Sequence, residues 1–255
     1  MLTNCRVVLV RTHYAGNIGS AARAMKNFGL TDLVLVDPIA NVTDHQARML
    51  ATNGGDILDV ARVVPDFYAA VADCGYVLGS SGETAGTLRR TLVGTPRELL
   101  PKFVQTLAST RCALVFGPEP HGLANEELAR CHALLVLPTA AEFTSLNLAL
   151  AVGITLYELH QFYREGTTTP PEAATRPPAA YADFDRAMAH LHDALTDVRF
   201  LFGQNGEALM HAFRHMVGRA LPTQQEVKLL HGLARQMEYA ADQMKKAETQ
   251  MRGPK

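Results

Sequence analysis

The sequence predicts an α/β protein in which a mostly parallel sheet is followed by a small helical domain. Through the first 160 or so residues, short apolar runs alternate with helical patterns, whereas beyond residue 180 only helical patterns occur. The apolar runs are continuous rather than alternating, which is typical of strands covered on both faces. A composition of 47% hydrophobic and 19% charged residues is sufficient for a packed core.

The expected elements follow in order along the 255 residues. The spacing predicts strands over 6–10, 32–36, 61–64, 76–79, 112–116 and 133–137, and helices over 18–28, 44–51, 66–72, 96–107 and 125–131. A proline-rich stretch, 166–180, marks a boundary. Three helices are expected after this stretch. The first has apolar residues at helical spacing from Phe184 to Val198, and the others run over about 207–217 and 223–246. Thr223 and Glu226 form a capping pattern at the start of the last helix. We therefore expect a first domain at 1–163, a linker at 164–180 and a helical domain at 181–250.

Charge and cysteine content exclude some classes of protein. Lys and Arg number 24 against 25 Asp and Glu, which counts mildly against a nucleic-acid partner, although a local patch matters more than the total. None of the four cysteines forms a CxxC pair, so we expect free buried thiols. His211 and His215 have the spacing of a zinc pair, but no third ligand is evident, and no metal is expected. With no signal peptide or membrane-length apolar run visible, we expect a cytoplasmic protein without a membrane partner.

Three segments rich in Gly and small polar residues follow predicted strands, at the edge where parallel α/β sheets bind ligands. The first is Tyr14–Arg23. Here Asn17 is expected to cap a helix, Gly19 permits close backbone approach, and Arg23 lies near enough to the helix start to face a phosphate. A capped turn with a surface arginine is the alternative interpretation.

The second and third segments have similar character. In Phe116–Leu123, prolines stiffen the loop, Gly117 and Gly122 let it bend, and Glu119 sits at its mouth. Such a loop can present backbone groups to a flat ligand such as adenine; alternatively it is a plain turn in which Glu119 caps the next helix. In Phe143–Tyr157, Thr144 or Ser145 is expected to cap a helix that is apolar almost all round, with Asn147 covered in its first turn and needing a partner.

In this order and spacing, the three segments resemble the signature motifs of the TrmH branch of the SPOUT RNA methyltransferases. The stretches VVLVRTHYAGNIGSAARAMKNFGL, NEELARCH and LPTQQEVKLLHGL further resemble the TrmJ-type subfamily, which methylates the ribose of tRNA nucleotide 32, cytidine or uridine. The resemblance implies a trefoil knot in the C-terminal part of the sheet, S-adenosylmethionine as cofactor, tRNA as substrate and a homodimer.

The resemblance also implies roles for individual residues. Arg23 would be catalytic, in one subunit serving the cofactor site of the other, and Ser145 is one candidate proton acceptor beside water and a substrate phosphate. The motifs are completed by Asn17, Gly19, Glu119, Gly122 and Asn147. The implied cofactor contacts are Ser80, Ser81, Gly82, Gly117, Leu137, Thr144, Ser145 and Leu146.

The RNA contacts are where the sequence departs from the subfamily. Pro118 and Pro120 stand where arginines usually flank the motif-two Glu, and the arginines after Ser81 come later, at Arg89 and Arg90. Helical-domain cations, among them Arg214 and Arg219, are further candidates for phosphate contact, or else an ordinary solvated face. Two alternatives remain: 2′-O-methylation of another RNA (ribosomal RNA or another tRNA position), and a non-catalytic RNA-binding dimer.

Overall fold

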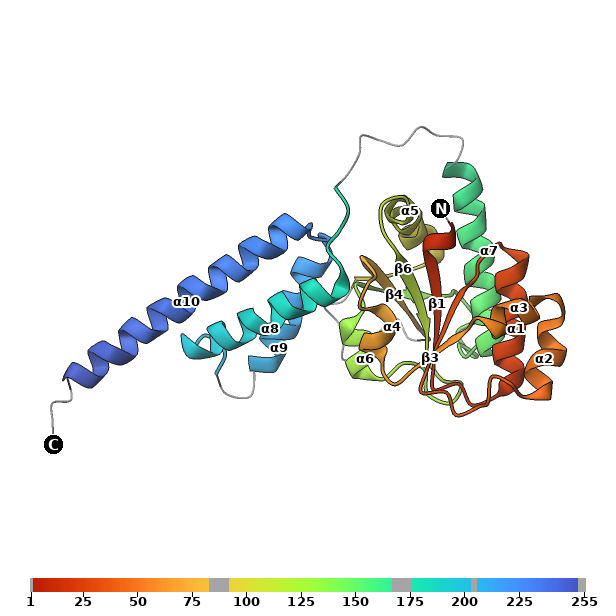
Figure 1. Ribbon diagram of the computed structural model, residues 1–255, viewed down its shortest axis with the longest axis horizontal. Coiled ribbons are helices and arrows are strands. Elements are labelled where there is room, and N and C mark those ends of the chain that lie inside the picture. Colours follow the sequence, from red (N-terminus) through yellow and green to blue (C-terminus); the bar gives the residue numbers. More distant parts are fainter. Residues whose placement is uncertain (1, 83–91, 167–175, 203–205, 252–255) are drawn as a thin grey trace. The chain divides into compact units, whose positions relative to one another are not determined.

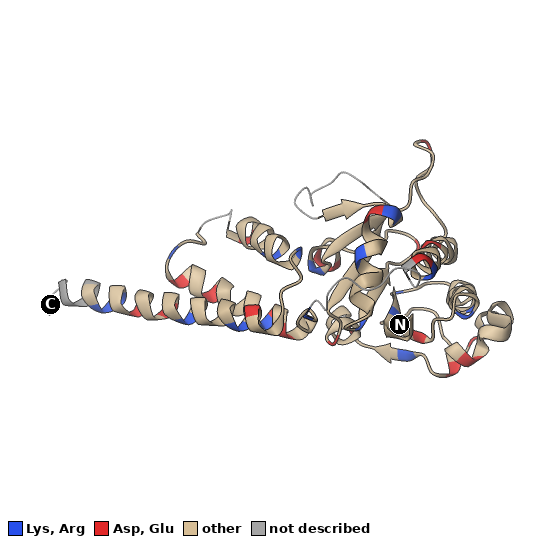
Figure 2. Ribbon diagram, turned by 90° about the horizontal axis from the view of Figure 1, so that it is seen from above, with Lys and Arg blue, Asp and Glu red and all other residues tan. Residues whose placement is uncertain are grey.

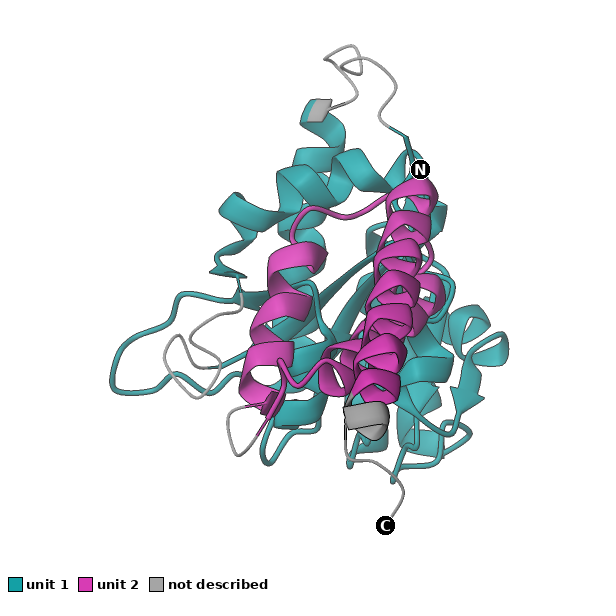
Figure 3. Cartoon of the chain, turned by 90° about the vertical axis from the view of Figure 1, so that its left-hand side faces the viewer, with its two compact units in different colours: residues 1–178 teal, residues 179–255 magenta. Residues whose placement is uncertain are grey.

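Two units make up the chain, Met1–Pro178 and Ala179–Lys255, coloured separately in Figure 3. The computed structural model describes residues 2–82, 92–166, 176–202 and 206–251. In that part of the chain, no helix combines the length and the apolar character that a membrane crossing requires. The division after Pro178 falls within the stretch 164–180 that the sequence marks as a linker.

The first unit is built on a seven-stranded parallel sheet in the order β3-β2-β1-β6-β4-β7-β5 (Figure 1). This confirms the predicted α/β class with a mostly parallel sheet, whereas the trefoil knot stays a prediction. Each predicted strand is present within one or two residues, and β5 is an additional one. The strands are β1 Cys5–Val10, β2 Asp32–Val36, β3 Arg62–Val64, β4 Tyr76–Ser81, β5 Leu92–Gly94, β6 Cys112–Phe116 and β7 Ala133–Val136.

Helices cover both faces of this sheet, which explains why its central strands are largely apolar. Every residue of β1, β6 and β7 is buried. Figure 1 shows α1 and α7 on one face and α4 and α6 on the other. The helices are α1 Ala15–Asn27, α2 His45–Ala51, α3 Gly55–Asp59, α4 Phe67–Val71, α5 Pro96–Leu107, α6 Asn125–Arg130 and α7 Leu148–Gly166, with short 3-10 turns at Leu2–Asn4 and Thr52–Gly54.

Gly19 is needed where α1 meets α2. A Cβ atom at this position would lie 2.1 Å from the backbone oxygen of Ala47, closer than any side chain permits. The predicted close approach at Gly19 is therefore the approach of a second helix, and it lets α1 and α2 pack closely together.

A cluster of charges closes the edge at which the parallel strands begin. The Arg6 side chain, 2% exposed, donates from Nε to Asp32 Oδ2 at 2.9 Å and from Nη1 to Asp73 Oδ1 at 2.6 Å. Arg111 contacts both carboxylates, and Arg62 contacts Asp32. A buried cation is tolerated here because two carboxylates and the Ala70 carbonyl surround it.

The four cysteines are free and buried, as the sequence predicts. Burial raises the pKa of all four thiols, that of Cys74 to about 12. Thiols held in the protonated form are poor nucleophiles, so these side chains act as small apolar core residues.

The second unit contains the helices α8 Tyr181–Asp197, α9 Gly206–Gly218 and α10 Gln224–Met251. Its core is formed by apolar residues at helical spacing, Phe184, Met188 and Leu191 among them, packed with Met210 and Ala234. The predicted capping of α10 is present, because the Thr223 N–H donates to Glu226 Oε2 at 2.7 Å.

Candidate functional site

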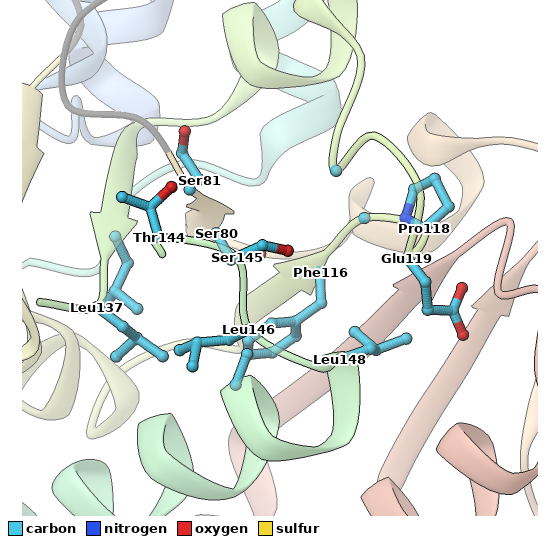
Figure 4. Close-up of a pocket in the computed structure, with 15 residues that line it drawn as sticks. Ser80, Ser81, Phe116, Pro118, Glu119, Leu137, Thr144, Ser145, Leu146 and Leu148 are labelled. Carbon is cyan, nitrogen blue, oxygen red and sulfur yellow. The ribbon is translucent and has the colours of Figure 1, made fainter. Parts of the chain in front are cut away.

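A pocket opens at the edge where strands β4, β6 and β7 end (Figure 4). It encloses about 680 Å³, part of which is open to solvent. All the residues to which the resemblance assigns cofactor contacts line it: Ser80, Ser81, Gly82, Gly117, Leu137, Thr144, Ser145 and Leu146. Sequence reasoning did not assign Phe116, Pro118, Leu135, Leu148 or Ala151, which also line it and lie beside the predicted residues.

The pocket wall has a polar and an apolar side. Figure 4 shows the hydroxyl groups of Ser81 and Thr144 on one side and the side chains of Leu137, Leu146 and Phe116 on the other. Such a wall suits a ligand with a flat apolar ring system and several hydrogen-bonding groups.

The loop after β6 reaches the pocket because two glycines let it fold tightly. A Cβ atom at Gly117 would lie 2.1 Å from the backbone nitrogen of Leu123, and Gly122 has a φ of +67°. The Gly122 N–H donates to the carbonyl of Pro118 at 2.9 Å. Backbone, rather than a side chain, therefore forms the pocket wall at this point.

A relay of hydrogen bonds joins the three predicted segments. Asn147 Nδ2 donates to Asn17 Oδ1 at 3.0 Å, and Asn17 Nδ2 donates to Glu119 Oε1 at 2.7 Å. These residues are separated by 130 and 102 positions in the chain. The relay ties the start of α1 to both the β6 loop and the segment before α7, which form opposite parts of the pocket wall.

Glu119 is the acceptor at the end of this relay. Its carboxylate also accepts from the backbone N–H groups of His13, at 2.9 Å, and Tyr14, at 3.3 Å. Partial burial raises the pKa of Glu119, but the hydrogen bonds from the His13 N–H and the Asn17 amide lower it more, so the pKa lies below its ordinary value. An ionised carboxylate with its oxygens engaged anchors α1 and is a poor proton acceptor.

Two predicted helix caps are wrong. The helix α1 begins at Ala15, so Asn17 lies in its first turn and uses its side chain for the relay instead of capping. The helix α7 begins at Leu148, and Asn147 caps it by accepting from the Leu150 N–H at 3.2 Å. Thr144 and Ser145 are left exposed before the helix, where they line the pocket, and Asn147 is exposed rather than covered.

The partners of Glu119 could not be predicted from the sequence. The alternative in which it caps the next helix is wrong, because its carboxylate receives the N–H groups before α1 instead. The sequence gives no signal for this contact, since the partners are backbone groups more than 100 positions away.

Comparison with known proteins decides the family. The profile described as the SpoU rRNA methylase family matches residues 4–157, which is more than half of the chain. The chain belongs to the SpoU rRNA methylase family. A second profile, described as the C-terminal domain of the tRNA methyltransferase TrmJ, matches residues 182–249 of this methylase.

Relatives of the methylase cover both of its units. A tRNA (cytidine/uridine-2′-O-)-methyltransferase TrmJ of Photorhabdus laumondii is 38% identical over 93% of this chain and 98% of its own. The crystal structure of TrmJ from Z. mobilis is 30% identical, covers 91% of this chain and 98% of its own, and has a TM-score of 0.75. A probable methylase family protein from Haemophilus influenzae is 34% identical, with a TM-score of 0.62, and covers 96% of this chain and 100% of its own.

Arg23 of the methylase does not line the pocket. It lies more than two turns into α1, is exposed, and has no hydrogen bond or ion pair with the residues that the structure describes. The pocket of one chain therefore holds the motif-two and motif-three residues, whereas the predicted catalytic guanidinium is directed to solvent.

The predicted RNA contacts differ in their surroundings. Arg89 and Arg90 lie outside the described residues. Arg214 donates to Asp185 Oδ1 at 2.6 Å and stacks over the Phe184 ring at 5.7 Å, so its guanidinium is engaged within the helical unit. Arg219 is exposed at the end of α9.

The predicted histidine pair is a contact within one helix. The Nε2 atoms of His211 and His215 lie 3.2 Å apart, and burial lowers the pKa of His215 to about 4. Among the described residues, no group of three or more His, Cys, Asp or Glu side chains could hold a metal ion.

Proposed function

We propose that this methylase transfers a methyl group from S-adenosylmethionine to a ribose 2′-oxygen of tRNA, at the cytidine or uridine of nucleotide 32. The observation that carries the proposal is the relay from Asn147 through Asn17 to Glu119, which draws three distant motifs around one pocket. Relatives that match this chain over nearly their whole length are named tRNA (cytidine/uridine-2′-O-)-methyltransferases.

The pocket fits S-adenosylmethionine by its donor set. The apolar side at Leu137 and Leu146 suits an adenine ring, and the hydroxyls of Ser80, Ser81 and Thr144 suit its ribose and amino-acid groups. When bound, the cofactor supplies an electrophilic methyl group on a sulfonium. The residues of the chain then have to orient the ribose and handle the charge that develops on its oxygen.

We assign Arg23 to the stabilisation of the negative charge that develops on the ribose oxygen. A guanidinium stays protonated, so its role is to stabilise the oxygen and grip an adjacent phosphate rather than to take the proton. Glu119 is a poor proton acceptor, because its oxygens already receive three hydrogen bonds. Ser145, water and a substrate phosphate remain the candidates for the proton acceptor.

Because Arg23 is absent from the pocket of its own chain, we assign it to the pocket of a second copy. The outer face of α7 suits the dimer contact: Leu150, Ile154 and Tyr157 are 53%, 37% and 50% exposed, and Gly153 faces open space. An exposed apolar helix face of this kind is typical of a subunit interface.

Mixed dimers test the assignment in trans. We would combine an Arg23→Ala chain with a Ser145→Tyr chain, whose enlarged side chain blocks the pocket. Each variant alone is expected to be inactive, whereas random mixing is expected to restore about a quarter of wild-type activity, since half of the dimers are mixed and one of their two sites is intact. Absence of any restored activity would contradict the assignment.

We assign the helical unit to tRNA binding. Lys228 and Arg235 alternate with acidic residues along α10, where Figure 2 shows blue and red segments side by side. Substituting Arg219, Lys228 and Arg235 by Ala together is expected to weaken tRNA binding and reduce its salt dependence, with cofactor affinity unchanged. Unchanged tRNA affinity would contradict this assignment.

The target nucleotide is tested directly by mapping ribose methylation with mass spectrometry. Unmodified tRNA and ribosomal RNA fragments would be incubated with the protein and the cofactor. Methylation at nucleotide 32 alone is the expected result. A solved structure that covers 65% of this chain at 27% identity is described in terms of the 2-OH methylation of C/U34 on tRNA, so nucleotide 34 is the specific alternative within tRNA.

A non-catalytic RNA-binding dimer would behave differently. The described pocket retains its hydroxyl and glycine residues, which a protein without cofactor chemistry does not need. Calorimetric titration with S-adenosylmethionine is expected to show binding, and failure to bind would favour the non-catalytic alternative.

A further inference from the structure

An aromatic side chain stands exposed at the start of α1. Tyr14 is the residue before the helix, is 63% exposed, and makes no capping hydrogen bond with its side chain. Tyrosine is a poor choice for this position on grounds of helix stability, where Ser, Thr, Asp and Asn are preferred. The fold of the chain therefore gives no reason for a tyrosine here.

The backbone that carries this ring is held in place. The Tyr14 N–H donates to Glu119 Oε1 at 3.3 Å, and the preceding His13 N–H donates to Oε2 at 2.9 Å. Glu119 itself lines the pocket. The ring is thus presented from a backbone position held next to a residue of the pocket wall, with the imidazole of His13 beside it at 6.5 Å between ring centroids.

The two side chains that contact Tyr14 are polar. Its contacts are the exposed His13 ring and the half-buried carboxylate of Glu119. This differs from the outer face of α7, where consecutive turns expose Leu150, Ile154 and Tyr157. A single aromatic ring among polar groups matches the flat face and polar edges of a nucleic-acid base better than it matches an apolar protein surface.

We propose that Tyr14 stacks on a base of the RNA substrate beside the reacting ribose and so positions that ribose at the pocket. This rests on the proposed function. Sequence-specific and sequence-tolerant RNA-binding proteins alike splay bases out of the strand and stack them on aromatic side chains. Stacking places the tyrosine ring against the π face of a base. Because every base has a π face, this contact accepts either pyrimidine at the reacting position.

The test compares three substitutions at this position. Tyr14→Phe keeps the ring, Tyr14→Leu keeps apolar bulk without a ring, and Tyr14→Ala removes both. Val63→Ala serves as the matched control, since Val63 is a comparably exposed apolar residue, 57%, on the edge strand β3. We expect Tyr14→Ala and Tyr14→Leu to weaken tRNA affinity by about 5- to 100-fold and to raise KM for tRNA accordingly, while Tyr14→Phe and the control stay near wild type.

Fluorescence reports the stacking itself. A tRNA carrying a fluorescent base analogue at or beside nucleotide 32 is expected to be quenched on binding to the wild type and to Tyr14→Phe, and not on binding to Tyr14→Leu. Cofactor affinity, measured by calorimetry, is expected to be the same in all variants. Equal quenching and equal affinity for Tyr14→Leu and wild type would overturn the proposal.

Two other outcomes are distinguishable. If Tyr14→Ala shifted the dimer dissociation constant in sedimentation and lowered tRNA affinity only through that shift, the ring would belong to a protein interface and the proposal would be overturned. If the wild type transferred no methyl group to any RNA, the proposed function would fail. The proposed stacking of Tyr14 would still be tested by tRNA affinity and fluorescence quenching, because neither measurement requires methyl transfer.

Discussion

Two regions of the first unit, the edge where the strands begin and the helix α1, handle charge in opposite ways. Where the strands begin, Arg6 is 2% exposed and is enclosed by Asp32 and Asp73, which Arg111 also contacts. On α1, the predicted catalytic cation, Arg23, is exposed more than two turns into the helix and has no partner in the described part of the chain.

The difference separates stability from function. A buried cation that is fully paired contributes to the folded state and is unavailable to a ligand. An exposed cation without a partner adds little to stability and remains available to an anionic substrate. If this comparison holds, substitutions at the edge where the strands begin change the free energy of unfolding, and substitution of Arg23 changes activity.

The largest effect is expected from Arg6→Ala. Removing the buried guanidinium leaves two carboxylates close together, and we expect the free energy of unfolding to fall by about 3–5 kcal/mol, as measured by urea denaturation at pH 7. Arg111→Ala is the control: Arg111 contacts the same two carboxylates but is 42% exposed, so a loss of at most about 1 kcal/mol is expected. Equal losses for the two variants would show that burial does not decide the contribution.

Arg23→Ala is expected to lower activity and to leave the free energy of unfolding nearly unchanged. Loss of the cation that stabilises the developing oxyanion is expected to lower kcat by about 100- to 1000-fold. The free energy of unfolding is expected to stay within about 0.5 kcal/mol of wild type, because Arg23 is exposed and unpartnered among the described residues. Arg23→Lys keeps the charge but loses the planar fork, so an intermediate activity is expected; full activity would contradict the clamp role.

Sequence patterns predict the frame of this fold well, for a physical reason. Strands such as Cys112–Phe116 are covered on both faces, so they are recognisable as short apolar runs, and the helix Pro96–Leu107 begins at a proline after a capping threonine. The strand Leu92–Gly94 escapes prediction because its two apolar residues are followed by a glycine and a threonine, whereas the other three-residue edge strand, Arg62–Val64, ends in two consecutive valines and was predicted.

The site was less predictable than the frame. The residues of the pocket follow from the resemblance, and all the implied cofactor contacts lie together. The caps at Asn17 and Thr144 were assigned to the wrong residues, because local propensity cannot register that the Asn17 amide gains a carboxylate and a second amide from distant segments. Long-range polar pairing of this kind leaves no periodic signal in a sequence.

A smaller effect, with a characteristic pH dependence, is expected from Asn17→Asp. The new carboxyl group would face Glu119 across 2.7 Å, and repulsion raises the pKa of one of the two groups. At pH 8 both are charged, so we expect cofactor affinity to fall by about 10-fold or more, measured by calorimetry. At pH 5.5 a shared proton restores a donor, and the loss is expected to shrink.

The uncharged variant Asn17→Ala provides the control for that experiment. It interrupts the relay without adding a carboxylate, so its loss of affinity is expected to be the same at pH 8 and pH 5.5. If both variants lost the same affinity at both pH values, the contact between Asn17 and Glu119 would not be what couples α1 to the pocket.

The smallest effect is expected from Asp73→Asn, which changes the free energy of unfolding at the edge where the strands begin. Partial burial raises the pKa of Asp73, but hydrogen bonds from Arg6 and Arg111 lower it more, to about 2 from its ordinary 3.8. The unfolded chain therefore takes up this proton first as pH falls, so the contribution of Asp73 to the free energy of unfolding is complete above about pH 4 and is lost toward pH 2.

Asp73 is 49% exposed, so solvent screening limits the difference in the free energy of unfolding between wild type and variant to about 1 kcal/mol or less at pH 7. Urea denaturation at pH 7, 4 and 3 is expected to show the gap closing only below pH 4. A gap that closed near neutral pH would mean that another group, and not the carboxylate beside Arg6, governs the acid stability of this edge.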